Sequence, residues 1–305
     1  MYESDESGTP GGSARSAGAE AAGNGVTEPW RAAEGGREPR AASPAGIDTS
    51  VAHNARVWNY WLGGKDNYGP DRGAGDHVRS LFPSIVDVAR ADRAFLRRVV
   101  HHLVGGVGLR QFLDVGTGLP TADNTHEVAQ AVAPESRVVY VDNDPLVLVH
   151  AQALLTSRPP GVTDYIEADI RDPERILETA RSTLDFDRPI GLILLGVLNF
   201  VLDTEEAAAV VGRLVDALPP GSHVALTHPT LEMGGEANAA AMEFWNENAT
   251  PPITPRTVAE ISAFVDGLEI LEPGVVSCAE WRPDSAEADG GPQRVAQVGI
   301  VARKS

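Results

Sequence analysis

The stretch QFLDVGTG, residues 111–118, decides the fold of this chain. Its first five residues form a short, mainly apolar run that is typical of a buried strand. Gly116 and Gly118 follow, and glycines let the backbone turn tightly and approach a ligand closely. In parallel α/β sheets, ligands bind outside the carboxyl ends of the strands. The stretch therefore predicts an α/β domain with its ligand at the end of this strand.

Outward from this turn, strand patterns alternate with helix patterns. Further strands are expected over residues 137–141, 163–168, 190–195 and 224–227. Three of the intervening helices have clear start signals, because aspartate caps a helix N-terminus and proline fits its first turn: Asp144-Pro145, Asp172-Pro173 and Asp203-Thr204-Glu205-Glu206. This alternation predicts a mostly parallel sheet with helices on both faces.

Segments on either side complete the predicted organisation. A helix over residues 85–104 belongs to an N-terminal helical cap, residues 47–110, which precedes the Rossmann-like domain, residues 111–305. Within that domain, residues 230–262 are expected to be a helical insertion, with one helix over 236–248 and a second beginning at Thr254-Pro255. Two final strands, near 269–278 and 297–302, suggest a hairpin that closes the sheet edge.

The first 46 residues differ from the rest, since 28 of them are Ala, Gly, Ser or Pro. Such a segment cannot bury enough apolar surface to offset its ordering entropy, so we expect a disordered tail. Just beyond it lie four aromatic residues, Trp58, Tyr60, Trp61 and Tyr68. They could form a lid over a ligand or anchor the cap to the core, and both interpretations stay open.

Charge and composition exclude several function classes. The net charge of -18 disfavours nucleic acid and anionic membranes as partners, because both require a basic surface. The single cysteine rules out an intrachain disulfide and a thiol-based zinc site, and no metal-ligand spacing is present. The N-terminus lacks a signal-peptide pattern and the longest apolar run, 190–202, is too short to span a bilayer. We expect a cytoplasmic protein.

Acidic residues at successive strand ends point to a nucleoside ligand. Asp142 ends the second strand, where a carboxylate can accept both hydroxyls of a ribose, and Asp169 ends the third, where it can accept the adenine amino group. Asp144 is a weaker candidate for the ribose, because its place before Pro145 gives it a sufficient role as a helix cap. One such acid could be a solvated strand end, but Asp114, Asp142 and Asp169 at three successive strand ends favour binding.

The residues after the first strand favour a sulfonium ligand over a dinucleotide. A dinucleotide site needs a third glycine, which packs the helix against the strand. The run GTGLPT, residues 116–121, lacks it. Asp114 would also bring a negative charge near phosphates, whereas that charge suits the ammonium group of a methionine moiety. A nicotinamide-dependent oxidoreductase is therefore the weakest alternative.

Four stretches resemble an actinobacterial family of S-adenosylmethionine-dependent methyltransferases that was first catalogued as a domain of unknown function: ARVWNYWLGGKDN (55–67), QFLDVGTGLPT (111–121), NTHE (124–127) and VYVDNDP (139–145). The resemblance extends from about residue 47 to the C-terminus. It implies a Rossmann-like class I methyltransferase fold, with a seven-stranded sheet whose last strand is antiparallel, and S-adenosyl-L-methionine as cofactor. It does not imply a particular acceptor.

The resemblance also implies cofactor binding at Asp114, Gly116, Gly118, Asp142 and Asp169. We expect further cofactor contacts from their neighbours and from the cap, namely Thr117, Asn143, Ile170, Arg56 and Tyr60. Arg56 could bind the methionine carboxylate through two hydrogen bonds, or could simply pair with a surface acid.

Methyl transfer needs mainly proximity and alignment, because the donor is already activated. A hydroxyl acceptor would also benefit from a base. His126 and His228 are weak candidates, since a lone histidine is more often structural, and Asn199 could contact the acceptor or cap a turn. We expect a methyltransferase acting on a small molecule. The alternative is a non-catalytic sensor or partner-binding protein that keeps the cofactor pocket.

Overall fold

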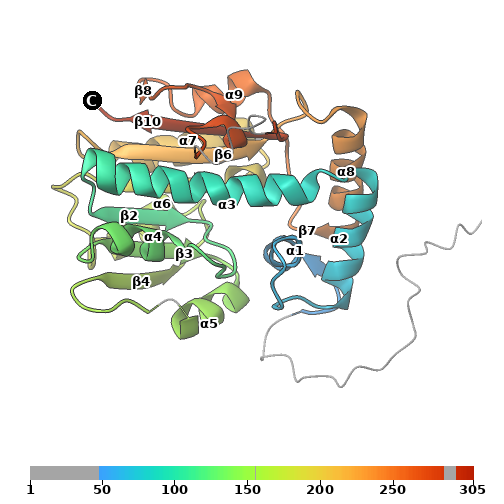
Figure 1. The fold of residues 1–305 in the computed structure, drawn as a ribbon, viewed down its shortest axis with the longest axis horizontal. Coiled ribbons are helices and arrows are strands. Elements are labelled where there is room, and N and C mark those ends of the chain that lie inside the picture. The colour runs from blue at the N-terminus through green and yellow to red at the C-terminus, as the bar shows by residue number, and fades with distance from the viewer. Residues whose placement is uncertain (1–47, 155, 285–292) are drawn as a thin grey trace, which may run out of the picture. The chain divides into compact units, whose positions relative to one another are not determined.

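The computed structural model describes residues 48–154, 156–284 and 293–305, and its centre is a sheet of mostly parallel strands (Figure 1). The strand order is β4-β3-β2-β5-β6-β10-β8. The parallel members are β2 (Gln111–Val115), β3 (Arg137–Asp142), β4 (Val162–Glu167), β5 (Gly191–Leu195) and β6 (His223–Pro229). The tail expected over residues 1–46 lies outside the described residues.

The last strand, β10 (Gln297–Arg303), runs antiparallel to β6. On its other side it pairs with two short strands, β8 (Glu269–Ile270) and β9 (Val276–Ser277). The expectation of one strand over 269–278 is therefore wrong in detail. Pro273, which has no N–H to donate, and Gly274, at φ +94°, interrupt the pairing between the two pieces. Together they occupy the seventh position of the sheet, so the predicted fold class is confirmed.

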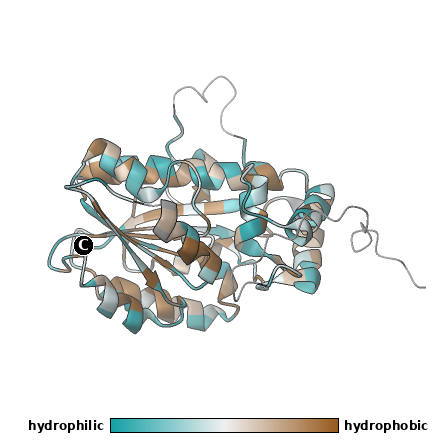
Figure 2. Ribbon diagram, turned by 90° about the horizontal axis from the view of Figure 1, so that it is seen from below, coloured by the Kyte–Doolittle hydropathy of each residue, from teal (hydrophilic) through white to brown (hydrophobic). Residues whose placement is uncertain are grey.

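Helices cover both faces of the sheet, and alternation along the strands explains why. In β3, Val138 and Tyr140 join one buried cluster while Val139 and Val141 join the other. The first cluster includes residues of α3 (Ile85–His101) and α4 (Thr125–Val132), and the second includes residues of α6 (Pro173–Ala180), α7 (Thr204–Asp216) and α9 (Val258–Ala263). Figure 2 shows the largely hydrophobic strands between these two layers of helices.

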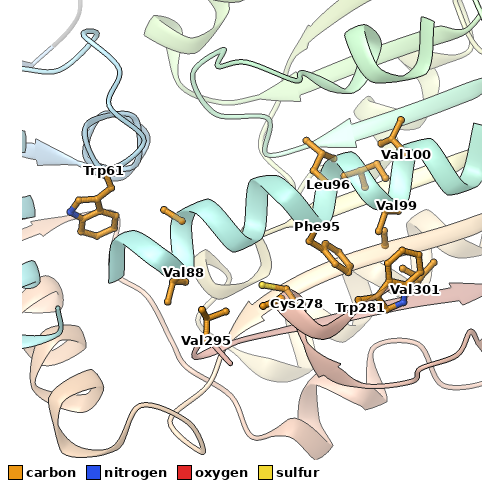
Figure 3. Packing of buried hydrophobic residues seen from close by; sticks show 14 of the residues in the cluster. Trp61, Val88, Phe95, Leu96, Val99, Val100, Cys278, Trp281, Val295 and Val301 are labelled. Atoms are coloured by element: carbon orange, nitrogen blue, oxygen red, sulfur yellow. The ribbon is translucent and has the colours of Figure 1, made fainter. Parts of the chain in front are cut away.

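Helix α3 lies along one face of the sheet, roughly parallel to the strands, and anchors the first cluster (Figure 3). Phe95 on α3 is fully buried and meets the ring of Trp281 edge-on, with 5.6 Å between the ring centroids. Each large side chain buried in this way contributes about 1.5–3 kcal/mol. The other end of α3 lies near Trp61, so the same helix joins the sheet to the N-terminal segment.

A cap lies beside the carboxyl ends of the parallel strands, next to the beginning of α3 (Figure 1). It contains α1 (Asn54–Trp61) and α2 (Gly69–Leu81) from the N-terminal side and α8 (Gly235–Asn248) from the insertion after β6. The strands β1 (Ala52–His53) and β7 (Ala249–Thr250) pair in parallel and tie the two parts together. The N-terminal segment and the insertion after β6 therefore form a single cap, although they are far apart in the sequence.

Several helix boundaries differ from the expected ones. The α-helical part of α3 ends at His101, and residues 102–107 form a π-helical segment before Gly108, which adopts φ +89°. The second helix of the insertion begins at Val258, not at Thr254. Thr257 caps it, because its hydroxyl and the Glu260 carboxylate bond to each other's backbone N–H groups. The remaining elements are α5 (Pro145–Leu154) and the 3₁₀ turns Leu198–Phe200 and Cys278–Glu280.

The predicted capping residues are confirmed where the structure describes them. Asp172 accepts a hydrogen bond from the Arg175 N–H, and Asp203 accepts one from the Glu206 N–H. None of the described helices has the length and apolar character that crossing a bilayer would need.

Candidate active site

A cavity of about 270 Å³ opens at the carboxyl ends of β2 to β5 and continues beneath the cap. Eight of the ten residues expected to contact the cofactor line it together: Asp114, Gly116, Thr117, Gly118, Asp142, Asn143, Asp169 and Ile170. They are far apart along the chain, and the parallel strands bring them together by ending at one edge of the sheet, as the sequence predicted. Arg56 and Tyr60 do not line the cavity.

The turn after β2 depends on Gly116. This residue adopts φ +78°, and its N–H donates to the Val141 carbonyl at 2.8 Å. A Cβ atom built on it would lie 2.4 Å from Cγ2 of Val197. Gly118 also has a positive φ, +66°, but a Cβ there would meet open space. The two glycines therefore have different roles. Gly116 allows the turn to pack closely against Val197, and Gly118 leaves the space beside it in the cavity open.

Asp142 is held rigidly at the end of β3. Its Oδ2 accepts a hydrogen bond from the Gly118 N–H at 2.8 Å, and its Oδ1 accepts one from the Asp144 N–H at 2.9 Å. Burial raises the pKa of Asp142 to about 6. Asp144 does not line the cavity, and its carboxylate accepts from the Leu146 N–H, as expected of a cap on α5. Of the two acids, only Asp142 faces the ligand space.

Asp114 lies deeper, at the end of β2, where its side chain is buried. Its Oδ2 accepts a hydrogen bond from the Thr125 hydroxyl at 2.6 Å. Burial raises the pKa of Asp114 to about 6 as well, while the Arg93 guanidinium acts to lower it. Both acids therefore lose most of their charge as the pH falls through about 6, and are largely ionised at neutral pH.

Asp169 is half-exposed and already has several partners. It accepts hydrogen bonds from the Asn143 amide at 2.9 Å and from the Arg171 N–H at 2.9 Å, and it pairs with the Arg171 guanidinium. These contacts join the loops after β3 and β4 and orient the carboxylate at the cavity wall.

Arg56 is buried and fully engaged within the cap. Its Nε contacts both carboxylate oxygens of Asp71 at 2.9 and 3.0 Å, and its Nη atoms donate to the Asp48 and Val51 carbonyls. Asp71 has no exposed surface, so the partner of Arg56 is a buried acid and not a surface acid. The Asp71 carboxylate also accepts hydrogen bonds from the backbone N–H groups of His53 and Tyr68. Asp71 thus joins four segments of the cap.

The four cap aromatics separate into two groups. Trp58 and Trp61 line the cavity and contact each other edge-on, with 5.9 Å between ring centroids. Tyr60 donates its hydroxyl hydrogen to Asp76, and Tyr68 lies beside the Arg56 guanidinium. The two tryptophans thus both anchor the cap and form a wall of the cavity, so the two interpretations of the aromatic cluster are compatible. Whether the cap moves as a lid stays a prediction.

The two candidate histidines are both buried and partnered away from the cavity. His126 contacts the Tyr140 hydroxyl through its Nδ1 at 2.9 Å. His228 lies 2.8 Å from Arg256 through its Nε2, and burial lowers the pKa of His228 to about 4. Neither lines the cavity, so the structure gives neither access to an acceptor there.

A family model for S-adenosyl methyltransferases matches residues 40–305. The chain belongs to this family. Two solved structures are similar over nearly their whole length. One is a DUF574 family protein from Streptomyces avermitilis, with 46% identity and a TM-score of 0.81, covering 85% of this chain and 99% of its own. The other is a candidate methyltransferase from Thermobifida fusca, with 39% identity and a TM-score of 0.77, covering 87% of this chain and 99% of its own. No curated protein matches the chain significantly.

The methyltransferase family uses S-adenosylmethionine, and the strand-end half of the cavity fits that cofactor. Gly118 leaves open space for close backbone approach, and two fixed carboxylates, Asp114 and Asp142, line the cavity. Within the part of the chain that the structure describes, no cluster of three or more His, Cys, Asp or Glu side chains could hold a metal ion.

The cap-side half of the methyltransferase cavity is mainly apolar, and of its lining residues the sequence pointed only to Trp58 and Trp61. Its wall includes Trp58, Trp61, Leu62, Val78, Phe82, Ile85, Val88, Leu96, Met242, Trp245 and Ile253. Two charged residues of α3, Asp92 and Arg93, also line the cavity. Asp92 left a signal in the sequence: it stands at helical spacing between Val88 and Phe95, on the face that packs into the core.

Proposed function

We propose that this methyltransferase transfers a methyl group to a small-molecule acceptor bound beneath the cap. The observation that carries the proposal is the continuity of the cavity, which joins the strand-end acids to an apolar wall of three tryptophans. The cofactor supplies an activated methyl group when bound. The protein therefore needs mainly to hold both molecules in line and to keep water out. A concave, mainly apolar pocket with a small number of polar groups is typical of a small-molecule site.

In this proposal, residues at the strand ends hold the cofactor. Asp142 accepts the two ribose hydroxyls, because its backbone hydrogen bonds fix it at the cavity wall while leaving lone pairs toward the cavity. Asp169 and Ile170 frame the adenine, and Asn143 keeps Asp169 in place. Asp114, ionised at neutral pH, attracts the methionine ammonium group.

Arg93 takes the role that the sequence suggested for Arg56. It lines the cavity, and its guanidinium is near enough to Asp114 and Asp92 to influence the pKa of each. Its Nη2 donates to the Ala122 and Asp123 carbonyls, while its Nε is buried without a partner among the described residues. A buried donor without a partner is costly, and a carboxylate would satisfy it. We propose that Arg93 binds the methionine carboxylate.

The size class of the acceptor is directly testable. Purified protein is incubated with methyl-labelled S-adenosylmethionine and a soluble cell extract, and the products are separated by size. The label should appear in molecules smaller than about 1 kDa, which a pocket of this kind can admit. Label found only in protein or nucleic acid would contradict the small-molecule proposal.

Asp142→Ala should weaken the binding of S-adenosylhomocysteine by about 1–3 kcal/mol, as measured by calorimetry, because the ribose hydroxyls lose their acceptor. Asp172→Ala is the matched control: it removes the aspartate cap of α6, does not line the cavity, and should lower stability without changing affinity. Equal affinities of wild type and Asp142→Ala, in folded protein, would contradict the ribose assignment.

Arg93→Met should reduce affinity for S-adenosylhomocysteine by about tenfold, as expected for a lost hydrogen bond to a charged group. The same variant should leave affinity for 5′-methylthioadenosine unchanged, because that compound lacks the amino-acid group. Arg97→Met, which removes an exposed arginine one turn further along α3, is the control. Parallel losses for both ligands would show that Arg93 supports the fold and not the carboxylate.

A further inference from the structure

A buried carboxylate faces the cap-side half of the cavity. Asp92 lies on the core side of α3 and is 5% exposed. Its Oδ1 accepts a hydrogen bond from the Thr227 hydroxyl at 2.5 Å and another from the Gln297 amide at 3.3 Å. Gln297 also donates to Thr227 at 3.1 Å, so three elements, α3, β6 and β10, fix this oxygen. The carboxylate is held in one orientation.

The second oxygen, Oδ2, makes no hydrogen bond with any described residue. Asp92 lines the cavity, so a ligand bound there can supply the donor that this oxygen lacks among the described residues. Leaving a buried carboxylate half-satisfied is costly, and a ligand that brings an O–H or N–H would remove that cost. Burial raises the pKa of Asp92, which makes it a better proton acceptor than an exposed aspartate.

Strand order places Asp92 beside the cofactor half of the cavity. Its partner Thr227 is on β6, which neighbours β5, which in turn neighbours β2 and its glycine turn. Adjacent strands are about 4.8 Å apart, so Thr227 and Gly116 are separated by on the order of 10 Å. Gly196 directly follows β5 and lies between Thr227 and Gly116. A Cβ atom built on Gly196 would be 3.8 Å from the side-chain nitrogen of Gln297, which bonds to Asp92. An acceptor touching Asp92 can therefore also reach the cofactor.

A second buried polar group, on Asn199, also lines the cavity. Asn199 is 5% exposed, and its side-chain oxygen has no hydrogen-bond partner within the part of the chain that the structure describes. Apart from these groups the wall is rich in flat rings, with Trp58, Trp61 and Trp245 among them. Such a surface is suited to another flat ring, because stacked and edge-on ring pairs add to the energy of burial.

We propose that Asp92 binds the reacting hydroxyl or amine of the acceptor and takes its proton, so that the substrate is a largely apolar, ring-bearing molecule with one such group. This inference rests on the proposed function, which supplies the reaction but names neither acceptor nor base.

The step balances without any further reactant. The proton of the O–H or N–H moves to Oδ2 of Asp92, and the lone pair on that oxygen or nitrogen forms a bond to the methyl carbon. The carbon–sulfur bond breaks, and its electron pair stays on sulfur, which becomes a neutral thioether. The positive charge of the sulfonium and the negative charge of Asp92 disappear together. Asp92 then returns its proton to water.

Two matched probes, 2-naphthol and 2-methoxynaphthalene, test the inference by calorimetry on the protein saturated with S-adenosylhomocysteine. They share one ring system, but only the first has a donor. We expect wild type to bind 2-naphthol at least tenfold more tightly. In Asp92→Asn, the amide oxygen can still accept from Thr227 and Gln297, while the cavity-facing atom becomes a donor. The preference should then vanish or reverse. Asp87→Asn, an exposed acid on the same helix, should keep it.

Equal affinity of the two probes in wild type, or no binding of either, would overturn the inference, and neither result depends on whether a variant folds. An unchanged preference in Asp92→Asn would do the same. Saturation with S-adenosylhomocysteine is measured first, so failure of the proposed cofactor site would be visible separately, as absent binding in that first titration.

Discussion

Arg56→Ala should lower the free energy of unfolding by about 3–5 kcal/mol, because it leaves Asp71 as an uncompensated buried charge. Neither side chain of this pair is more than 4% exposed, so little water can replace the missing guanidinium. Two backbone carbonyls, of Asp48 and Val51, would lose their donors as well. Denaturant unfolding followed by tryptophan fluorescence measures the effect, since Trp58 and Trp61 belong to the same cap.

The result also separates the two roles that the sequence left open for Arg56. In the structure Arg56 does not line the cavity, so folded Arg56→Ala should bind S-adenosylhomocysteine as tightly as wild type does. The double variant Arg56→Met with Asp71→Leu should recover only part of the lost stability. Removing both charges avoids the unpaired one, but the backbone N–H groups of His53 and Tyr68 lose the acceptor that Asp71 provides. A normal unfolding free energy with weakened cofactor binding in Arg56→Ala would contradict this account.

Gly116→Ala should lower the free energy of unfolding by roughly 2–5 kcal/mol. About 1–2 kcal/mol comes from placing a Cβ at a positive φ, and about 1–3 kcal/mol from overpacking against Val197. Cofactor affinity should fall too, because relief of the clash displaces the turn that presents Gly118 and Asp142. Thermal or denaturant unfolding gives the first quantity and calorimetry with S-adenosylhomocysteine gives the second.

Gly118→Ala is the matched comparison, since it has a similar φ but no neighbour within 4 Å of the added atom. Its stability loss should be limited to the backbone cost of about 1–2 kcal/mol. Adding Val197→Ala to Gly116→Ala should restore part of the stability by making room. If the two glycine substitutions destabilised equally, packing against Val197 would not explain the need for Gly116.

Local chain patterns were enough to predict that the strand-end acids and the glycine turn meet in one cavity. Each of Asp114, Asp142 and Asp169 ends or follows a strand whose limits show in the apolar pattern, and parallel strands bring their carboxyl ends to one edge. The helix caps at Asp172 and Asp203 act within three residues along the chain, so the sequence was sufficient for them as well. The broken edge strand, β8 and β9, was missed because its Pro273-Gly274 interruption was not weighed against the strand pattern.

The sequence by itself thus determined the fold class, the glycine turn and the acids around it, because strand pattern, turn and cap are all set by neighbouring residues. Only the tertiary structure decided which charged side chains face the ligand. Nothing in the sequence distinguishes Arg56 from Arg93 as a partner for a ligand carboxylate. In the structure Arg56 pairs with Asp71 inside the cap, whereas Arg93 lines the cavity. Asp92 meets Gln297 across 205 positions, and the insertion after β6 joins the N-terminal segment through β1 and β7. Such contacts depend on how distant elements pack, and no spacing along the chain encodes them.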